Sequence, residues 1–133
     1  MNFSNYLEQA LLGVTLLGSS FTAPTTVYAA LATTIASDGD FFTEVATNTA
    51  YARVPVQWSA PTSGPTWTVA NSEAPPFAVS TTPWGAVAHF GLFDSPTIGA
   101  GNLLYWGDLG TAQNIGTGNT VQILAGSLTV RLS

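Results

Sequence analysis

Near the start of the chain, apolar residues recur at helical spacing. They stand at i, i+3, i+4 and i+7, at Leu7, Ala10, Leu11 and Val14. Asn5 followed by Glu8 resembles a capping box, and Gly18 stands where a glycine commonly ends a helix. The pattern predicts one N-terminal helix over about residues 5–17. Its apolar stripe either covers the open end of a sheet or forms an arm that docks on a partner.

Beyond Pro24 the helical period gives way to short runs rich in Thr, Val, Tyr, Trp and Phe, separated by turn residues. About eight runs are present, at residues 25–34, 41–46, 52–59, 66–71, 77–81, 86–93, 103–107 and 121–132. Their spacing is typical of a sandwich. The sequence therefore predicts an all-β fold: a jelly-roll-like antiparallel β-sandwich of about eight strands with one N-terminal helix.

Four of these runs alternate apolar and other residues with a period of two. The faces expected in the core are Val27, Ala29 and Leu31; Val54, Val56 and Trp58; Ala88, Phe90 and Leu92; and Leu128, Val130 and Leu132. Pro55 lacks an amide hydrogen, so its run is expected at a sheet edge. Gly91 and Gly126 are candidate bulges or bends.

Length and composition add a constraint on the surface. A chain of 133 residues without an evident linker is expected to form a single domain over residues 1–133. Hydrophobic residues make up 46% of the chain and charged residues only 7%. An ordinary soluble monomer carries about 25% charged residues. So little charge indicates a surface that packs against other protein.

The few charges also exclude several classes of partner. The chain has no lysine, its basic side chains are Arg53 and Arg131, and its net charge is −5, so neither nucleic acid nor an anionic membrane is an expected partner. Without cysteine, neither disulfides nor thiolate metal sites can form. The apolar residues 10–18 lack a preceding base, so we interpret them as mature sequence and not as a signal peptide.

The inventory of reactive side chains predicts no catalytic residue, cofactor or metal. The single histidine, His89, is expected in mid-strand, partly exposed or hydrogen-bonded, and no G-x-S-x-G turn provides a nucleophile for it. Asp38, Asp40 and Glu44 could hold calcium, but a simple Asp-Gly-Asp turn is the favoured interpretation because no EF-hand spacing follows. The remaining carboxylates show no spacing that selects an acid and base pair.

Four tryptophans in so short a chain are the more suggestive feature. Trp58 and Trp106 lie in apolar runs and are expected to be buried. Trp84, between Pro83 and Gly85 in a predicted turn, is the best candidate for exposure. An exposed aromatic ring can anchor an interface or stack on a sugar. The candidate interaction surface therefore comprises Leu7, Leu11, Val14 and Trp84.

Taken together, several stretches along nearly the whole chain resemble one family. They are SNYLE at residues 4–8, LL at 11–12, TTVYAAL at 25–31, YAR at 51–53, WGAVAHFGLFD at 84–94, GNLLY at 101–105 and LTV at 128–130. The chain resembles short structural proteins of tailed bacteriophages that are commonly labelled tail fibre proteins. The resemblance implies a non-enzymatic virion component that is assembled in the bacterial cytoplasm.

Two placements in the virion remain open. Fibre shafts are built from long chains with repeats or trimeric coiled segments, which this sequence lacks, so we expect a capsid decoration or cement protein that stabilises the head shell. Its partners would be the major capsid protein or other virion proteins, and it would form a homo-oligomer, a trimer or a dimer. The alternative is a tail fibre or receptor-binding module whose exposed aromatic residues contact host surface glycan.

Overall fold

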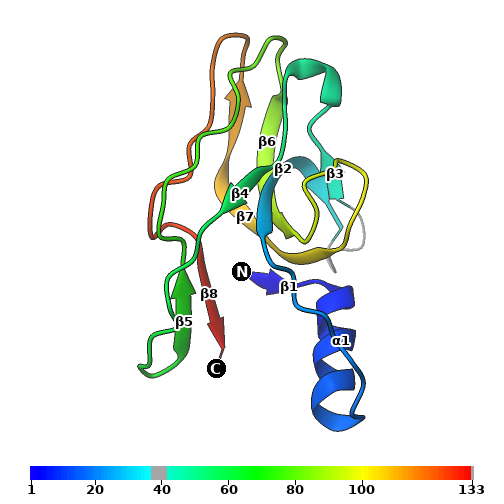
Figure 1. Cartoon of the computed structure of the whole chain (residues 1–133). Helices are drawn as coiled ribbons and strands as arrows, with labels where there is room; N and C mark the ends of the chain where they lie inside the picture. The colour runs from blue at the N-terminus through cyan, green and yellow to red at the C-terminus, as the bar shows by residue number, and fades with distance from the viewer. Residues whose placement is uncertain (37–41, 133) are drawn as a thin grey trace.

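Strands dominate the computed structural model of the chain, which describes residues 1–36 and 42–132 (Figure 1). In chain order the elements are β1 (Asn2–Phe3), α1 (Asn5–Leu16), β2 (Val27–Ile35), β3 (Phe42–Glu44), the 3-10 helix η1 (Thr47–Thr49), β4 (Val54–Val56), β5 (Trp67–Ala70), β6 (Gly85–Phe93), β7 (Leu103–Ile115) and β8 (Thr129–Leu132). The predicted all-β class with antiparallel pairing and one N-terminal helix is confirmed.

The larger sheet has the order β1-β7-β6-β2-β3, and its pairs are antiparallel. The long strands β2, β6 and β7 form its centre. β4 pairs with the first part of β2, and β3 pairs with the last part. β4 therefore lies at an edge, as the missing amide hydrogen of Pro55 predicted.

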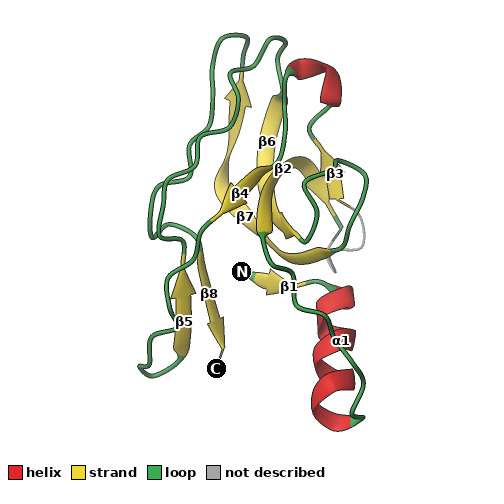
Figure 2. Ribbon diagram, in the orientation of Figure 1, coloured by secondary structure: helices red, strands yellow, loops and turns green. Residues whose placement is uncertain are grey.

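The second layer is smaller and less regular. β5 and β8 form a two-stranded antiparallel ribbon, and the loops that lead away from it run side by side along the larger sheet (Figure 2). These loops are held by bonds from the Phe77 amide to the Val121 carbonyl and from the Ser80 amide to the Asn119 carbonyl, each 2.9 Å. The prediction of a strand over residues 77–81 is wrong. Pro75 and Pro76 precede it without amide donors, so only isolated pairing forms there.

The core fills the space between the two layers. Its buried residues include Ala29, Leu31, Val56, Leu92 and Leu128, all from predicted inward faces, together with residues of the loops. Two face predictions fail. Val87 is fully buried, because the β6–β7 register shifts between Val87 and His89 and changes which residues point inward. Leu132 is 55% exposed, because β8 continues past the edge of the core.

Close backbone approach explains the glycine at position 91. The predicted bulge does not lie there, since Gly91 pairs regularly with Ala30 and Trp106. A Cβ atom at this position would lie 2.7 Å from Leu103 Cδ1 and 2.8 Å from a ring atom of Phe42. Gly91 thus admits these side chains to the second face of the sheet, where they pack with Ala30 and Trp106.

The helix α1 is capped one residue earlier than the sequence predicted. The N-cap is Ser4, whose hydroxyl accepts a hydrogen bond of 3.2 Å from the Leu7 amide and also donates to the Leu103 carbonyl. This corrects the proposed capping box at Asn5. Gly18, with φ of 68°, follows the helix as expected. Among the described residues, no helix is long and apolar enough to cross a membrane.

Candidate interaction surface

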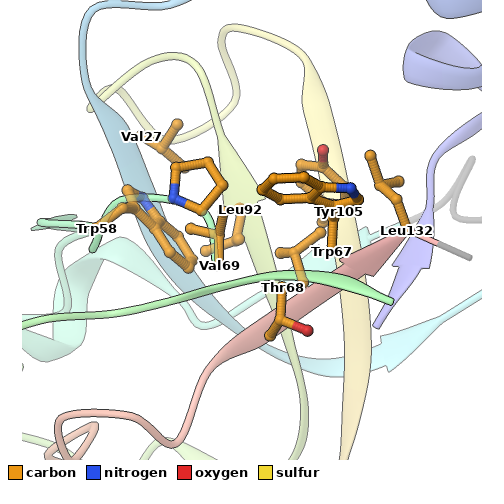
Figure 3. A pocket seen from close by; sticks show the side chains of 10 residues that line it. Val27, Trp58, Trp67, Thr68, Val69, Leu92, Tyr105 and Leu132 are labelled. Carbon is orange, nitrogen blue, oxygen red and sulfur yellow. The ribbon is translucent and has the colours of Figure 1, made fainter. Parts of the chain in front are cut away.

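An apolar pocket opens between the ribbon and the larger sheet, where the second layer leaves the core incompletely covered. Its volume is about 280 Å³. We call it the ribbon pocket, and it is lined by Val27, Trp58, Pro61, Trp67, Thr68, Val69, Leu92, Tyr105, Val130 and Leu132. Figure 3 shows Trp58 and Trp67 at opposite sides of the pocket, with Leu92 between them.

Strand pairing explains how these side chains converge. Leu92 and Tyr105 are paired residues of β6 and β7, so they point to the same face of the sheet. On the ribbon, Trp67 pairs with Leu132 and Val69 pairs with Val130, which places four apolar side chains on one face. Burial raises the pKa of the Tyr105 phenol above its usual value, because the charged phenolate is disfavoured away from water.

The chemistry of the pocket suits an apolar occupant. Its lining contains no charged residue, and Thr68 and Tyr105 supply the side-chain hydroxyls. A sugar placed here would bury hydroxyl groups with few partners, which costs free energy for each unpaired group. An apolar side chain would displace water from aromatic and aliphatic surface, which is favourable. The pocket is therefore built for hydrophobic contact.

A second apolar surface lies on α1. Only the first turns of the helix pack against β7, and the rest extends away from the sheet (Figure 1). Leu12 is 60% exposed and Leu16 is 75% exposed. Together with Glu8 they are spaced four residues apart and lie in one row, which we call the outer ridge. This row is turned away from Leu7, which is buried.

The structure does not bring the four predicted interaction residues together. Leu7 is buried within its own chain, Leu11 is partly buried and Val14 is exposed. The start of the helix covers β7. Its end extends away from the sheet and meets the segment that follows it, where the Ser19 amide donates to the Gly13 carbonyl. Leu12, Leu16 and Leu17, which are more exposed than Val14, lie outside the predicted stripe.

The prediction that Trp84 is exposed is wrong. Trp84 is 4% exposed, and its indole Nε1 donates a 3.0 Å hydrogen bond to the Thr49 carbonyl. Its ring meets the rings of Tyr51 and Phe77 edge to face, with centroids 5.6 and 6.4 Å away. The loops of the second layer close over a residue that local sequence places in a turn. Trp106 is buried as predicted, whereas Trp58 is only partly buried.

A buried ionic network was missed by sequence reasoning. The Arg53 guanidinium donates from Nε to Glu44 Oε1 and from its second terminal nitrogen to Oε2, both at 2.9 Å. It also donates to the carbonyls of Ser95 and Ala100, and it lies 3.7 Å from the centre of the Phe93 ring. These contacts join β3 and β4 to the loop between β6 and β7. The sequence did contain a signal for this network, because Arg53 is one of only two basic side chains in the chain.

Tyr51 extends this network into the core. Its hydroxyl donates to Glu44 Oε1 at 2.7 Å and accepts from the Leu31 amide at 2.9 Å. Burial and then the negative charge of Glu44 raise the pKa of Tyr51 well above its usual value. The network is structural because each charged group already has partners that neutralise or hydrogen-bond it.

The remaining candidate residues form no reactive cluster in the described chain. His89 lies in β6, partly buried, and its Nδ1 is hydrogen-bonded to Asp108 of β7, as the prediction of a partly exposed or hydrogen-bonded residue stated. Asp38 and Asp40, the candidate calcium ligands, lie outside the described residues. Glu44, the third candidate, is engaged with Arg53.

The fold and the exposed apolar surfaces define a small antiparallel β protein with one N-terminal helix. The family described as podophage GP4 fiber I protein gp80 matches residues 2–131. The chain belongs to this phage fibre family and is a structural component of a phage virion. No curated protein matches the sequence.

Proposed function

We propose that the chain is a non-enzymatic component of the phage fibre that attaches through one apolar end. The observation that carries the proposal is the position of its exposed hydrophobic side chains. Of the large ones, six lie in residues 1–17, at Met1, Tyr6, Leu12, Val14, Leu16 and Leu17, and two more, Trp67 and Leu132, lie on the ribbon. In Figure 1, α1 and the ribbon extend from the same end of the larger sheet.

Concentrated apolar surface of this kind usually marks an interface. A fibre subunit needs one strong attachment to the next subunit or to the virion, and a single apolar end supplies it. The capsid decoration protein that the sequence led us to expect would bridge several neighbouring shell subunits and so would need contacts around its perimeter. The arrangement together with the fibre family favours the fibre component.

Contact with host glycan is less well supported by the site. The aromatic residue proposed for it, Trp84, is buried, and the ribbon pocket offers few hydrogen-bonding groups to a sugar. The non-enzymatic role in this proposal rests on the fibre family, which is structural.

Labelled virions test this proposal. A gold-conjugated antibody against the purified chain, viewed by electron microscopy, is expected to mark the fibres, and quantitative mass spectrometry is expected to give a low copy number. Label spread over the head with hundreds of copies per particle would overturn the fibre proposal and support decoration. Antibody raised against the major capsid protein provides the matched control for head labelling.

A further inference from the structure

We propose that the outer ridge of α1 in one copy of the chain docks into the ribbon pocket of a second copy. This inference rests on the proposed fibre function and names the contact that would link one fibre subunit to the next. Each chain carries both a row of exposed leucine side chains on α1 and an apolar pocket beside the ribbon. Docking a helix through residues spaced four apart into a hydrophobic groove is a common mode of recognition.

The dimensions and chemistry of the two surfaces agree. Leu12 and Leu16 lie about 6 Å apart along the helix axis, from a rise of about 1.5 Å per residue. Both are mostly exposed. The ribbon pocket, at about 280 Å³, lies below the range of about 300–1,000 Å³ typical of small-molecule sites. An opening of this size, flanked by Trp58 and Trp67, suits aliphatic side chains.

The contact has to form between copies. Within one chain the start of α1 packs against β7, and Figure 1 shows α1 and the ribbon on opposite sides of the same end of the molecule. A contact between two different surfaces either forms reciprocally in a two-fold dimer, where each ridge enters the other copy's pocket, or is heterologous and then closes into a ring or continues as a filament. The heterologous form is the one that would join successive copies along a fibre.

Electrostatics support a second copy as the occupant. Copies of a chain with net charge −5 repel each other except where their facing surfaces carry little charge. Residues 9–36 and 54–72, which hold most of both surfaces, contain no charged side chain. The one charged residue of α1 is Glu8, and the one charged residue of the ribbon is Arg131. Arg131 alternates with Val130 and Leu132 along β8, so it lies on the ribbon face turned away from the pocket and leaves the pocket lining uncharged.

Sedimentation velocity of the full chain over a range of concentrations tests the inference. The wild type is expected to form oligomers as concentration rises. Leu16→Glu, which alters the ridge, and Trp67→Ala, which alters the pocket, are each expected to weaken association at least tenfold. Leu132→Glu serves as a second pocket variant, and circular dichroism checks that each variant is folded. Leu124→Glu is the control, since Leu124 is exposed and belongs to neither surface.

A mixture of complementary variants gives the decisive result. Leu16→Glu retains an intact pocket and Trp67→Ala retains an intact ridge, so together they are expected to form a one-to-one dimer that neither forms alone. A mixture that stays monomeric, or a control variant that loses association equally, would overturn the inference. A wild type that remains monomeric would also overturn it, whereas failure of the fibre proposal would be seen separately in the labelling of virions.

Discussion

The region around Trp84 and the region around Trp67 use the same kind of residue in opposite ways. Trp84 is enclosed by Tyr51 and Phe77, and its indole N–H has the Thr49 carbonyl as acceptor. Trp67 lies on the ribbon and is 58% exposed beside a pocket that no described residue fills. Around Trp84 the apolar side chains are covered by the chain itself, whereas around Trp67 apolar surface remains in contact with water.

This difference shows where in the molecule the shortage of charged residues leaves apolar surface exposed. A chain with 7% charged residues could expose apolar surface everywhere, but here much of it gathers on α1 and the ribbon. One buried ion pair is kept where it joins β3 and β4 to a distant loop, and it lies away from the ribbon pocket. Stability and association are thus assigned to different parts of the molecule, and substitutions should separate them.

The largest loss of stability is expected from Trp84→Ala. The change removes a buried ring from its contacts with the rings of Tyr51 and Phe77 and leaves the Thr49 carbonyl without its indole donor. Replacing a buried tryptophan by alanine costs about 3–5 kcal/mol. Equilibrium unfolding in urea measures the change, with Trp84→Phe as the partial control because it retains most of the ring. A loss below about 1 kcal/mol would show that this part of the core does not depend on this residue.

Arg53→Ala is expected to cost nearly as much. Removing one partner of a buried ion pair leaves the other charge unpaired, at a cost of about 3–5 kcal/mol. Both side chains of the pair are largely shielded from solvent, and Arg53 also holds the Ser95 and Ala100 carbonyls. Arg131→Ala is the matched control, because an exposed substitution changes stability by about 0.5 kcal/mol or less. Equal urea midpoints for the two variants would contradict the assignment.

Alkaline pH should reduce the stability of the same region by a smaller amount. The pKa of Tyr51 is raised in the folded chain, so the stabilisation is fully present below the unfolded value of about 10 and is lost as pH rises above it. The expected slope is about 1 kcal/mol per pH unit for this group. Unfolding measured between pH 9 and 11 should show a shallower decline in Tyr51→Phe, while Tyr105→Phe reports the separate contribution of Tyr105. Equal declines of the free energy of unfolding in the wild type and in Tyr51→Phe would contradict the assignment of this effect to Tyr51.

The sequence predicted those features that depend on local periodicity. The helix, the edge position of β4 and the inward faces of β2 and β4 follow from residue spacing and from the missing amide of Pro55. Val87 could not be placed, because a register shift between paired strands leaves no mark in the alternation of one strand. The segment at 77–81 has strand-forming residues, but its position beside an irregular loop decides its structure.

The candidate site was less predictable because exposure is set by distant parts of the chain. Trp84 lies in a turn that other loops cover, whereas Trp67 lies in a strand that nothing in the described chain covers on its open side. The outer ridge was visible as a four-residue spacing of Glu8, Leu12 and Leu16. It was passed over because the stripe at Leu7 and Leu11 matched a helical core face equally well. Pairing of Arg53 with Glu44 depends on the tertiary fold.

The smallest effect on stability is expected from Trp67→Ala, which makes the comparison of the two tryptophans quantitative. More than half of the Trp67 side chain is already in water, and its removal takes little from the core. We expect the free energy of unfolding to fall by about 1 kcal/mol or less, slightly above the roughly 0.5 kcal/mol usual for exposed positions because part of the ring is covered. The same variant is the one expected to lose association. Urea unfolding at a concentration where the wild type is monomeric isolates the stability term, and a loss as large as that of Trp84→Ala would mean that the ribbon belongs to the core.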